Sequence, residues 1–469
     1  MKKIIWIVGI LLTGVTCFGQ GISQDWYGIL SMPDGKALHL VFHITKAGEN
    51  YTTTLDSPDQ GARGLESGKT KVNGNLLTIE AAKYGIQYIG TYLPDSNLIK
   101  GVFKQGGGEI PLTLTATKAA ERITPPIVRP QDPKDFPYKQ EDVVFTNSKG
   151  RNQLAGTITM PSDGKARRIV ILISGSGAQN RNEELIGHRP FLVWSDWLTR
   201  HGIAVLRYDD RGTGQSTGNF KGATTADFAD DTEAAVNYIK SRPDLKKMEI
   251  GLVGHSEGGA IAPIVASRNP SVKFIVLLAG PGVSTEKLMA KQTEDLARAG
   301  GTPEDAIRLS VATNRKLYTL IVQNPGLSTE NLKQKVDTLL HTELRNYPTS
   351  YLGGKAISDI VSNAETMAID PWFRYFLAFN PDNYLQKTKC PVLALNGAKD
   401  MQVNAEANLA GIKSSLEKGG NKHFEIVPLE GLNHLFQKAG SGAFAEYGQI
   451  QETVNPAAME KVSAWIDQL

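Results

Sequence analysis

The chain has 469 residues, and its formal net charge of +3 is too small to suggest a nucleic-acid binder. The hydrophobic fraction of 41% and the charged fraction of 21% are ordinary for a globular protein, which argues against a largely disordered chain or a polytopic membrane protein. Two cysteines are too few for a disulfide scaffold or a cysteine-rich metal cluster, and eight histidines can be considered one by one. At about 150 residues per domain, the length leaves room for two or three domains.

Residues 1–19 have the layout of a secretory signal peptide. Two lysines and an apolar run over 4–12 are followed by small residues, and cleavage is expected between Gly19 and Gln20. An anchor helix is the less favoured interpretation, because a membrane span needs roughly 20 apolar residues. We therefore expect an exported, periplasmic or secreted protein with no stable membrane span after cleavage. Its one remaining thiol would be that of Cys390.

Residues 20–118 predict a small all-β accessory domain. Apolar and polar residues alternate over 38–44, which is the period of a half-buried strand. Glycine-containing turns separate this segment from further short apolar segments, so an antiparallel barrel or sandwich of about eight strands is expected. The other predicted strands lie at 51–55, 76–80, 87–92, 98–103 and 110–115. Five prolines then occur between 125 and 137, and they predict a semi-rigid linker over 119–140.

From residue 141 to residue 469 strands alternate with helices. This alternation predicts an α/β fold with a doubly wound, mostly parallel sheet. The segment at about 283–383 breaks the alternation and is helical in character, so we expect a helical cap above the carboxyl ends of the strands, where open α/β sheets bind ligands. Strands are predicted at 143–146, 153–160, 168–174, 204–208, 250–254, 274–279, 391–396 and 424–428, and helices at 189–201, 225–241, 257–268, 404–417 and 456–468.

The segment 254–258 reads G-x-S-x-G, between a predicted strand and a predicted helix. A serine in such a strand-to-helix turn sits in strained backbone, and the flanking glycines remove the Cβ atoms that would clash. The helix amino terminus adds positive potential where an oxyanion would form. Ser256 is therefore the predicted nucleophile.

A serine nucleophile needs a base and an acid that orients it. His255 is adjacent to Ser256, so its side chain should point away from Oγ. Among the other histidines His434 lies in a loop directly after the last predicted strand, and Asp400 follows the preceding strand in the same way. The order Ser, Asp, His along the chain is that of the α/β-hydrolase triad. Asp370 and Asp382 remain alternatives for the acid, although neither follows a clear strand.

Two backbone N–H groups must bind the developing oxyanion. The first is expected to come from Glu257, directly after the nucleophile. The second should come from the glycine-rich loop after the first parallel strand, where Ser176 is the preferred donor and Gly177 the next.

Together these residues resemble the α/β-hydrolase superfamily over 141–469, and within it the bacterial esterases of the serine-aminopeptidase-like (S33-like) group. The resemblance implies cleavage of small carboxylic esters, with an arginine–glycine loop that is structural, so Arg211 is not expected to be catalytic. The first 118 residues lie outside this resemblance. The segments that carry it are SGSGAQNRN at 174–182, RYDDRGTGQS at 207–216, GHSEGG at 254–259, NGAKD at 396–400 and GLNH at 431–434.

The expected function is that of a serine carboxylesterase acting on small-molecule esters with short to medium acyl groups, through an acyl-enzyme. This chemistry requires neither a metal nor an organic cofactor. A serine peptidase or aminopeptidase on the same triad is one alternative, because amide cleavage differs mainly in protonation of the leaving group and in pocket shape. The other is a ligand-binding protein in which the β domain holds the ligand, although a complete triad argues against it.

Overall fold

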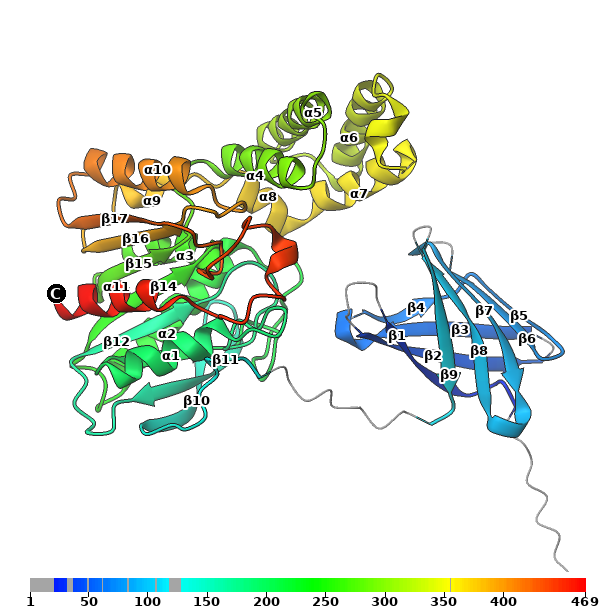
Figure 1. Ribbon diagram of the computed structural model, residues 1–469, viewed down its shortest axis with the longest axis horizontal. Helices are drawn as coiled ribbons and strands as arrows, with labels where there is room; N and C mark the ends of the chain where they lie inside the picture. Colours follow the sequence, from blue (N-terminus) through cyan, green and yellow to red (C-terminus); the bar gives the residue numbers. More distant parts are fainter. Residues whose placement is uncertain are drawn as a thin grey trace, which may run out of the picture. The chain divides into compact units, whose positions relative to one another are not determined.

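The computed structural model describes residues 21–31, 37–48, 50–60, 62–81, 84–105, 108–117, 128–354 and 356–469. The predicted signal peptide, residue 118 at the end of the predicted β domain and residues 119–127 of the predicted linker lie outside this description. The chain divides into two compact units, Met1–Pro126 and Ile127–Leu469, and each is considered by itself (Figure 1).

The first unit is an antiparallel β-barrel. Eight strands form its ring in the order β2-β1-β9-β8-β7-β6-β5-β3, pairing between β2 and β3 closes the ring, and β4 adds to β3. The strands are β1 (Asp25–Ser31), β2 (Ala37–Ala47), β3 (Asn50–Ser57), β4 (Ala62–Glu66), β5 (Lys69–Asn73), β6 (Leu76–Ala81), β7 (Ile86–Leu93), β8 (Leu98–Gln105) and β9 (Gly108–Thr115). Of the two predicted architectures, barrel and sandwich, the barrel is correct.

Side chains fill the interior of this barrel. Trp26, Phe42 and Tyr88 are all fully buried, and the Tyr88 ring lies 5.4 Å from that of Phe42. The Tyr88 hydroxyl donates to the carbonyl oxygens of Ile99 and Leu112, so its polar end is satisfied inside the apolar core. Alternation of apolar and polar residues along the strands thus produces a packed core.

The second unit is built on an eight-stranded sheet in the order β10-β11-β13-β12-β14-β15-β16-β17. The first two strands form an antiparallel hairpin, β11 pairs antiparallel with β13, and all other pairs are parallel. The strands are β10 (Lys139–Asn147), β11 (Asn152–Met160), β12 (Arg168–Ile173), β13 (Ala204–Tyr208), β14 (Glu249–His255), β15 (Val272–Leu278), β16 (Val392–Gly397) and β17 (Phe424–Leu429).

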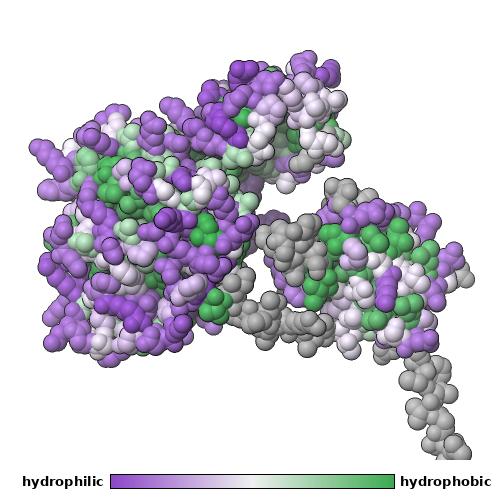
Figure 2. Space-filling model, in the orientation of Figure 1, coloured by the Kyte–Doolittle hydropathy of each residue, from purple (hydrophilic) through white to green (hydrophobic). Residues whose placement is uncertain are grey.

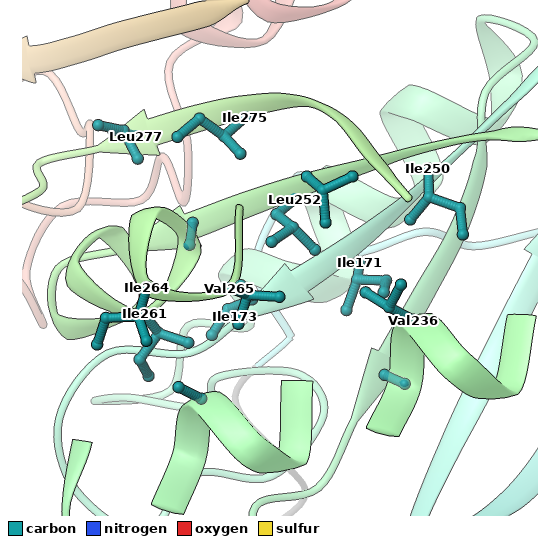
Figure 3. Close-up of a cluster of buried hydrophobic side chains, with 14 of the residues drawn as sticks. Ile171, Ile173, Val236, Ile250, Leu252, Ile261, Ile264, Val265, Ile275 and Leu277 are labelled. Atoms are coloured by element: carbon teal, nitrogen blue, oxygen red, sulfur yellow. The ribbon is translucent and has the colours of Figure 1, made fainter. Parts of the chain in front are cut away.

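Helices cover both faces of this sheet, which explains why its central strands are continuously apolar. Along β12, Ile171 packs with α2, α3 and α10, whereas Leu172 points to the opposite face with α1 and α11. Figure 3 shows part of the apolar core on the face of the sheet that carries Ile171, where Ile171, Leu252 and Ile275 meet side chains of α2 and α3. These helices are α1 (Pro190–Arg200), α2 (Thr225–Ser241), α3 (Glu257–Ala266), α10 (Ala405–Lys418) and α11 (Pro456–Asp467).

The topology places a switch point between β12 and β14. The chain leaves β12 toward β13 on one side and then returns to β14 on the other, so the loops after these two strands diverge. Ligands of open α/β sheets bind in the crevice that such a divergence creates.

The predicted cap is present as a helical insertion between β15 and β16, and its main helices form a lobe of their own (Figure 1). Figure 2 shows mainly hydrophilic residues on the visible face of this lobe. No helix within the described residues is both long and apolar enough to cross a membrane. The helices of the insertion are α4 (Thr285–Ala299), α5 (Glu304–Gln323), α6 (Thr329–Leu344), α7 (Ile357–Ile369), α8 (Pro371–Leu377) and α9 (Asp382–Leu385).

The predicted linker over 119–140 extends too far, because residues 128–138 pack on the second unit. Arg129 is 4% exposed and donates to the backbone oxygens of Ile186 and Gly448. Asp132 accepts from the guanidinium of Arg189 at 2.7 Å. Residues 128–138, with their prolines, are therefore a packed part of the second unit and do not act as a linker.

Candidate active site

Ser256 occupies a strained turn between β14 and α3. Its φ of 53° and ψ of −115° lie in a region that side chains other than glycine rarely adopt. Two backbone hydrogen bonds hold the turn: Ser256 N–H donates to Leu278 O at 2.8 Å, and Gly259 N–H donates to Ser256 O at 2.9 Å. The predicted strand–turn–helix context of the G-x-S-x-G segment is therefore observed.

The glycines of this segment allow the backbone to pack closely around the turn. A Cβ atom on Gly254 would lie 2.0 Å from the carbonyl oxygen of Gly258, and a Cβ on Gly258 would lie 2.1 Å from that of Ile173. Both contacts are with backbone, which has no freedom to move aside. Larger residues at these positions would push α3 away from β12 and β14.

His434 and Asp400 form a buried pair beyond the ends of β17 and β16. His434 Nδ1 donates to Asp400 Oδ2 at 2.7 Å, and the two side chains are 5% and 0% exposed. Because an ionised carboxylate only accepts hydrogen bonds, the proton sits on Nδ1, and Nε2 is the ring atom left to act as a base. Asp400 Oδ1 accepts the N–H groups of Gln402 and Val403 at 2.8 and 2.9 Å, which fixes the carboxylate.

The two alternative acids have other partners. Asp370 caps α8 by accepting the N–H of Phe373 at 2.8 Å. Asp382 lies at the start of α9 and accepts from the hydroxyl of Ser415. Within the described residues no hydrogen bond joins Ser256 Oγ to His434. The His434 ring does lie close to the turn that holds Ser256, because it is 4.8 Å from the ring of the adjacent His255. Such bonds are often long before substrate binds.

The two residues predicted to supply the oxyanion donors are in contact through their side chains. Glu257 is the first residue of α3, so its N–H has no partner inside the helix. The Ser176 side chain hydrogen-bonds to the Glu257 carboxyl group, which brings the loop after β12 to the amino terminus of α3. Gly175 in the same loop packs on the predicted nucleophile: a Cβ there would lie 3.2 Å from Ser256 Cβ.

The Glu257 side chain also connects this site to the cap. It accepts hydrogen bonds from Thr225 Oγ1 at 2.6 Å and from Trp372 Nε1 of α8 at 2.8 Å. Burial raises the pKa of this carboxyl group, and the hydrogen bonds from Thr225, Trp372 and Ser176 act in the opposite direction. The cap therefore contacts the residue directly after Ser256.

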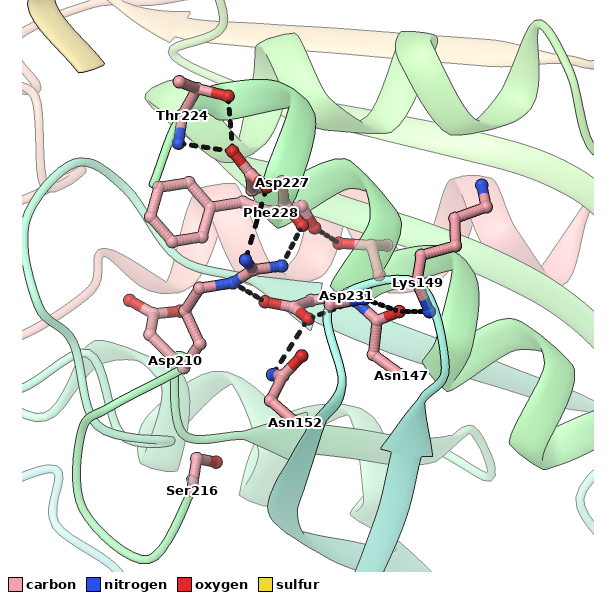
Figure 4. Close-up of polar contacts among 12 residues, drawn as sticks. Asn147, Lys149, Asn152, Asp210, Ser216, Thr224, Asp227, Phe228 and Asp231 are labelled. Atoms are coloured by element: carbon pink, nitrogen blue, oxygen red, sulfur yellow. Dashed lines mark hydrogen bonds and ion pairs between the residues drawn. The ribbon is translucent and has the colours of Figure 1, made fainter. Parts of the chain in front are cut away.

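The arginine–glycine loop at 207–216 is structural, as the resemblance implied. Arg211 Nε donates to Asp231 Oδ2 of α2 at 2.6 Å. Asp231 Oδ1 accepts from the side-chain amides of Asn147 and Asn152, so one buried carboxylate joins α2, the loop and the β10–β11 hairpin (Figure 4). Arg211 thus ties the loop to α2.

Three buried acidic or basic side chains near Ser256 have no counterpart in the sequence prediction. They belong to Glu183, His255 and Asp210, which as whole residues are 4%, 7% and 8% exposed. The sequence motif identifies His255 only as the residue before the nucleophile and gives no role to its side chain. No motif or spacing in the sequence singles out Glu183. No group of three or more His, Cys, Asp or Glu residues in the described part of the chain is placed to hold a metal ion.

Burial raises the pKa of Asp210 to about 8, and the nearby carboxylates of Glu257 and Glu183 add to this effect. Hydrogen bonds from Gln179 N–H and Ser174 Oγ, both at 2.9 Å, favour the ionised form but are outweighed. Asp210 therefore retains a proton in the folded protein at neutral pH.

We expect Asp210→Asn to reduce the loss of stability as pH rises. Above pH 4 the unfolded chain releases the proton that the folded protein keeps until about pH 8, so folding becomes less favourable across this window. At about 1.4 kcal/mol per pH unit, the wild type should lose ~4 kcal/mol between pH 5 and 8 through this group alone. Urea unfolding of both proteins at the two pH values measures the difference.

The exposed Asp467→Asn in α11 is the control for this measurement and should unfold like the wild type. Parallel pH dependence of Asp210→Asn and the wild type would show that Asp210 is ionised in the folded protein.

Comparisons with known proteins bear on the fold and on the class of the protein. The family described as serine aminopeptidase, S33, matches residues 187–367. Esterase EstD of Thermotoga maritima is 22% identical over 338 residues, which cover 71% of this chain and 68% of EstD. The uncharacterized protein YfhR of Escherichia coli K12 is 31% identical over 124 residues, which cover 26% of this chain and 40% of YfhR.

Among solved structures, the esterase Pf2001 of Pyrococcus furiosus superposes with a TM-score of 0.43 at 17% sequence identity, covering 72% of this chain and 95% of Pf2001. The mostly parallel sheet, the serine elbow after β14 and the matched sequences lead to one assignment. The second unit has an α/β-hydrolase fold and its residues 187–367 match the serine aminopeptidase, S33, family, and these findings support a hydrolase that also carries an N-terminal β-barrel.

Proposed function

We propose that the protein is a serine carboxylesterase with Ser256 as nucleophile, His434 as general base and Asp400 as the residue that orients the base. The observation that carries this proposal is the buried His434–Asp400 hydrogen bond of 2.7 Å, formed by loops at the same sheet edge as the strained Ser256. The similarity to EstD, a protein named as an esterase, supports the ester as substrate.

The proposed reaction has two steps. In the first, His434 Nε2 takes the proton of Ser256 Oγ while Oγ attacks the acyl carbon. The N–H groups of Glu257 and Ser176 bind the oxyanion, the ester C–O bond breaks, and the protonated His434 gives its proton to the departing alkoxide. In the second step His434 takes a proton from water and the hydroxide attacks the acyl carbon. The bond from that carbon to Ser256 Oγ then breaks, the protonated His434 returns its proton to Oγ, and the carboxylic acid leaves. Both steps use only groups of this chain and water.

A serine peptidase remains the second candidate because the matched family is described as serine aminopeptidase. The acidic residues of the cap do not decide between the two, since basic residues are mixed with them: Lys291 contacts Asp295 at 2.5 Å, and Arg298 contacts Glu304 at 2.7 Å. A ligand site inside the β-barrel is less favoured, because Trp26, Phe42 and Tyr88 fill the interior.

A fluorophosphonate probe and a substrate panel test this proposal. The probe should form one covalent adduct, on the peptide that contains Ser256, and should abolish hydrolysis of p-nitrophenyl acetate in proportion to labelling. Esters from acetate to decanoate are compared with aminoacyl p-nitroanilides. Cleavage of the anilides but not the esters would establish the peptidase instead. A protein that neither reacts with the probe nor cleaves either class would refute the serine-hydrolase mechanism.

A further inference from the structure

A buried ion pair between His255, the residue before Ser256, and Glu183 is not part of the proposed triad. His255 is the last residue of β14, and Glu183 belongs to the loop that follows β12. His255 Nδ1 and Glu183 Oε1 are 2.9 Å apart, and the two side chains are 9% and 5% exposed. Burying two such groups is costly unless both are paired, so the pair has a defined structural task.

Each partner also contacts one of the two loops that form the site. Glu183 Oε1 accepts the N–H of Gly175 at 2.6 Å, and His255 Nε2 lies 3.0 Å from the carbonyl oxygen of His434. Three hydrogen bonds therefore run from the oxyanion loop through Glu183 and His255 to the backbone of the proposed base. Gly175 itself packs on Ser256, so this chain passes next to the nucleophile.

The hydrogen-bond partners determine the protonation state of His255. One ring nitrogen faces a carboxylate and the other faces a carbonyl oxygen, and both of these groups only accept hydrogen bonds. With an ionised Glu183 both ring nitrogens donate, and His255 is then an imidazolium. Burial would lower the pKa of His255, but the charge and hydrogen bond of Glu183 raise it above the ordinary value.

The charged groups around the pair act in opposite directions. Asp400 and Glu183 stabilise a positive His255, whereas a protonated His434 would oppose it, since the two rings are 4.8 Å apart. On the other side the charge of Glu183 helps to raise the pKa of Asp210, so Asp210 keeps its proton and adds no second negative charge beside the pair at neutral pH. A positive His255 thus disfavours premature protonation of His434.

We propose that Glu183 and His255 are positioning residues, which hold the oxyanion loop and the base loop at a fixed separation around Ser256 and, through the positive charge of His255, keep His434 unprotonated before attack. This rests on the proposed serine-hydrolase function. The backbone of Glu183 supports it, because φ is +50°, a conformation that a glutamate keeps only where its surroundings enforce it.

Graded variants test the positioning role. Glu183→Ala removes the acceptor of both Gly175 and His255, and we expect kcat for p-nitrophenyl acetate to fall ~100-fold with KM changed less than about threefold. Glu183→Gln retains an oxygen at Oε1 for both bonds, and it should recover most of this loss at pH 6. His201→Gln, at the exposed end of α1, is the matched control and should behave like the wild type.

The pH profile tests the charge. In His255→Gln the acid limb of the kcat/KM profile should move upward by ~0.5–1 pH unit, because a positive charge no longer opposes protonation of His434. A merely structural role would lower activity without moving this limb. An unmoved limb together with unchanged kcat in His255→Gln and Glu183→Ala would overturn the proposal.

A measurement independent of activity separates this proposal from the proposed function. In protein labelled with [15N]histidine, the signals absent from His255→Gln identify that residue, and both of its ring nitrogens should be protonated at pH 8. A neutral His255 ring would overturn the proposal even in a fully active esterase. Failure of the esterase assignment has a different signature, namely the absence of fluorophosphonate labelling at Ser256.

Discussion

Ser256→Ala should lower kcat/KM for p-nitrophenyl acetate by roughly 10⁴- to 10⁶-fold, the range seen when other serine hydrolases lose their nucleophile. Alanine removes the attacking oxygen and leaves the backbone of the turn, its bonds to Leu278 and Gly259, and the oxyanion donors in place. The remaining activity would therefore measure what binding and the oxyanion hole contribute without covalent catalysis.

Ser267→Ala is the matched control, because Ser267 ends the same helix and its hydroxyl donates only to Ile264 O. It should keep wild-type kcat/KM. Thermal unfolding of both variants shows whether the turn is intact, and the labelling probe should no longer modify Ser256→Ala. Near-wild-type turnover by folded Ser256→Ala would be incompatible with an acyl-enzyme at this serine.

Asp400→Asn should lower kcat by about 10³- to 10⁴-fold with little change in folding. The reason is in the contacts of the carboxylate: Oδ1 accepts two backbone N–H groups, from Gln402 and Val403, so the amide oxygen of an asparagine must take that position. Its NH₂ group then faces His434 Nδ1 and donates to it. The proton of the imidazole is forced onto Nε2, and the nitrogen that should accept the proton of Ser256 is blocked.

Asp370→Asn provides the comparison, because an asparagine caps a helix about as well as an aspartate and Asp370 only caps α8. It should change kcat less than about threefold. Steady-state kinetics at several pH values completes the test. Equal losses in the two variants would mean that the acid role is not confined to Asp400.

The sheet was predictable because its central strands are buried on both faces and therefore read as unbroken apolar runs. The strands at β13 and β14 and the helix α2 follow directly from such patterns. The barrel was predicted less completely: β1, β4 and β5 were missed, and two of these, β4 and β5, are only five residues long. Five residues offer too few alternations to separate a strand from a turn.

Ser256, His434 and Asp400 could be chosen from sequence because each follows a strand, and parallel strands bring their carboxyl ends to one edge. The Glu183–His255 pair could not, since its members are 72 positions apart and one lies in a loop without periodicity. The packing of residues 128–138 on the second unit could not be predicted either, because its contacts also join residues far apart in the sequence. Arg129 binds a carbonyl oxygen 319 positions away, at Gly448. Such contacts exist only after the chain has folded.

The place of the helical cap in the chain has a consequence for how related proteins can diverge. The cap leaves the sheet after β15 and returns at β16, two strands that are parallel neighbours. An insertion between neighbouring strands can therefore be lengthened, shortened or replaced without altering strand order or the loops that carry Ser256, Asp400 and His434. One contact limits this freedom, namely the hydrogen bond from Trp372 of the cap to Glu257, the residue directly after Ser256.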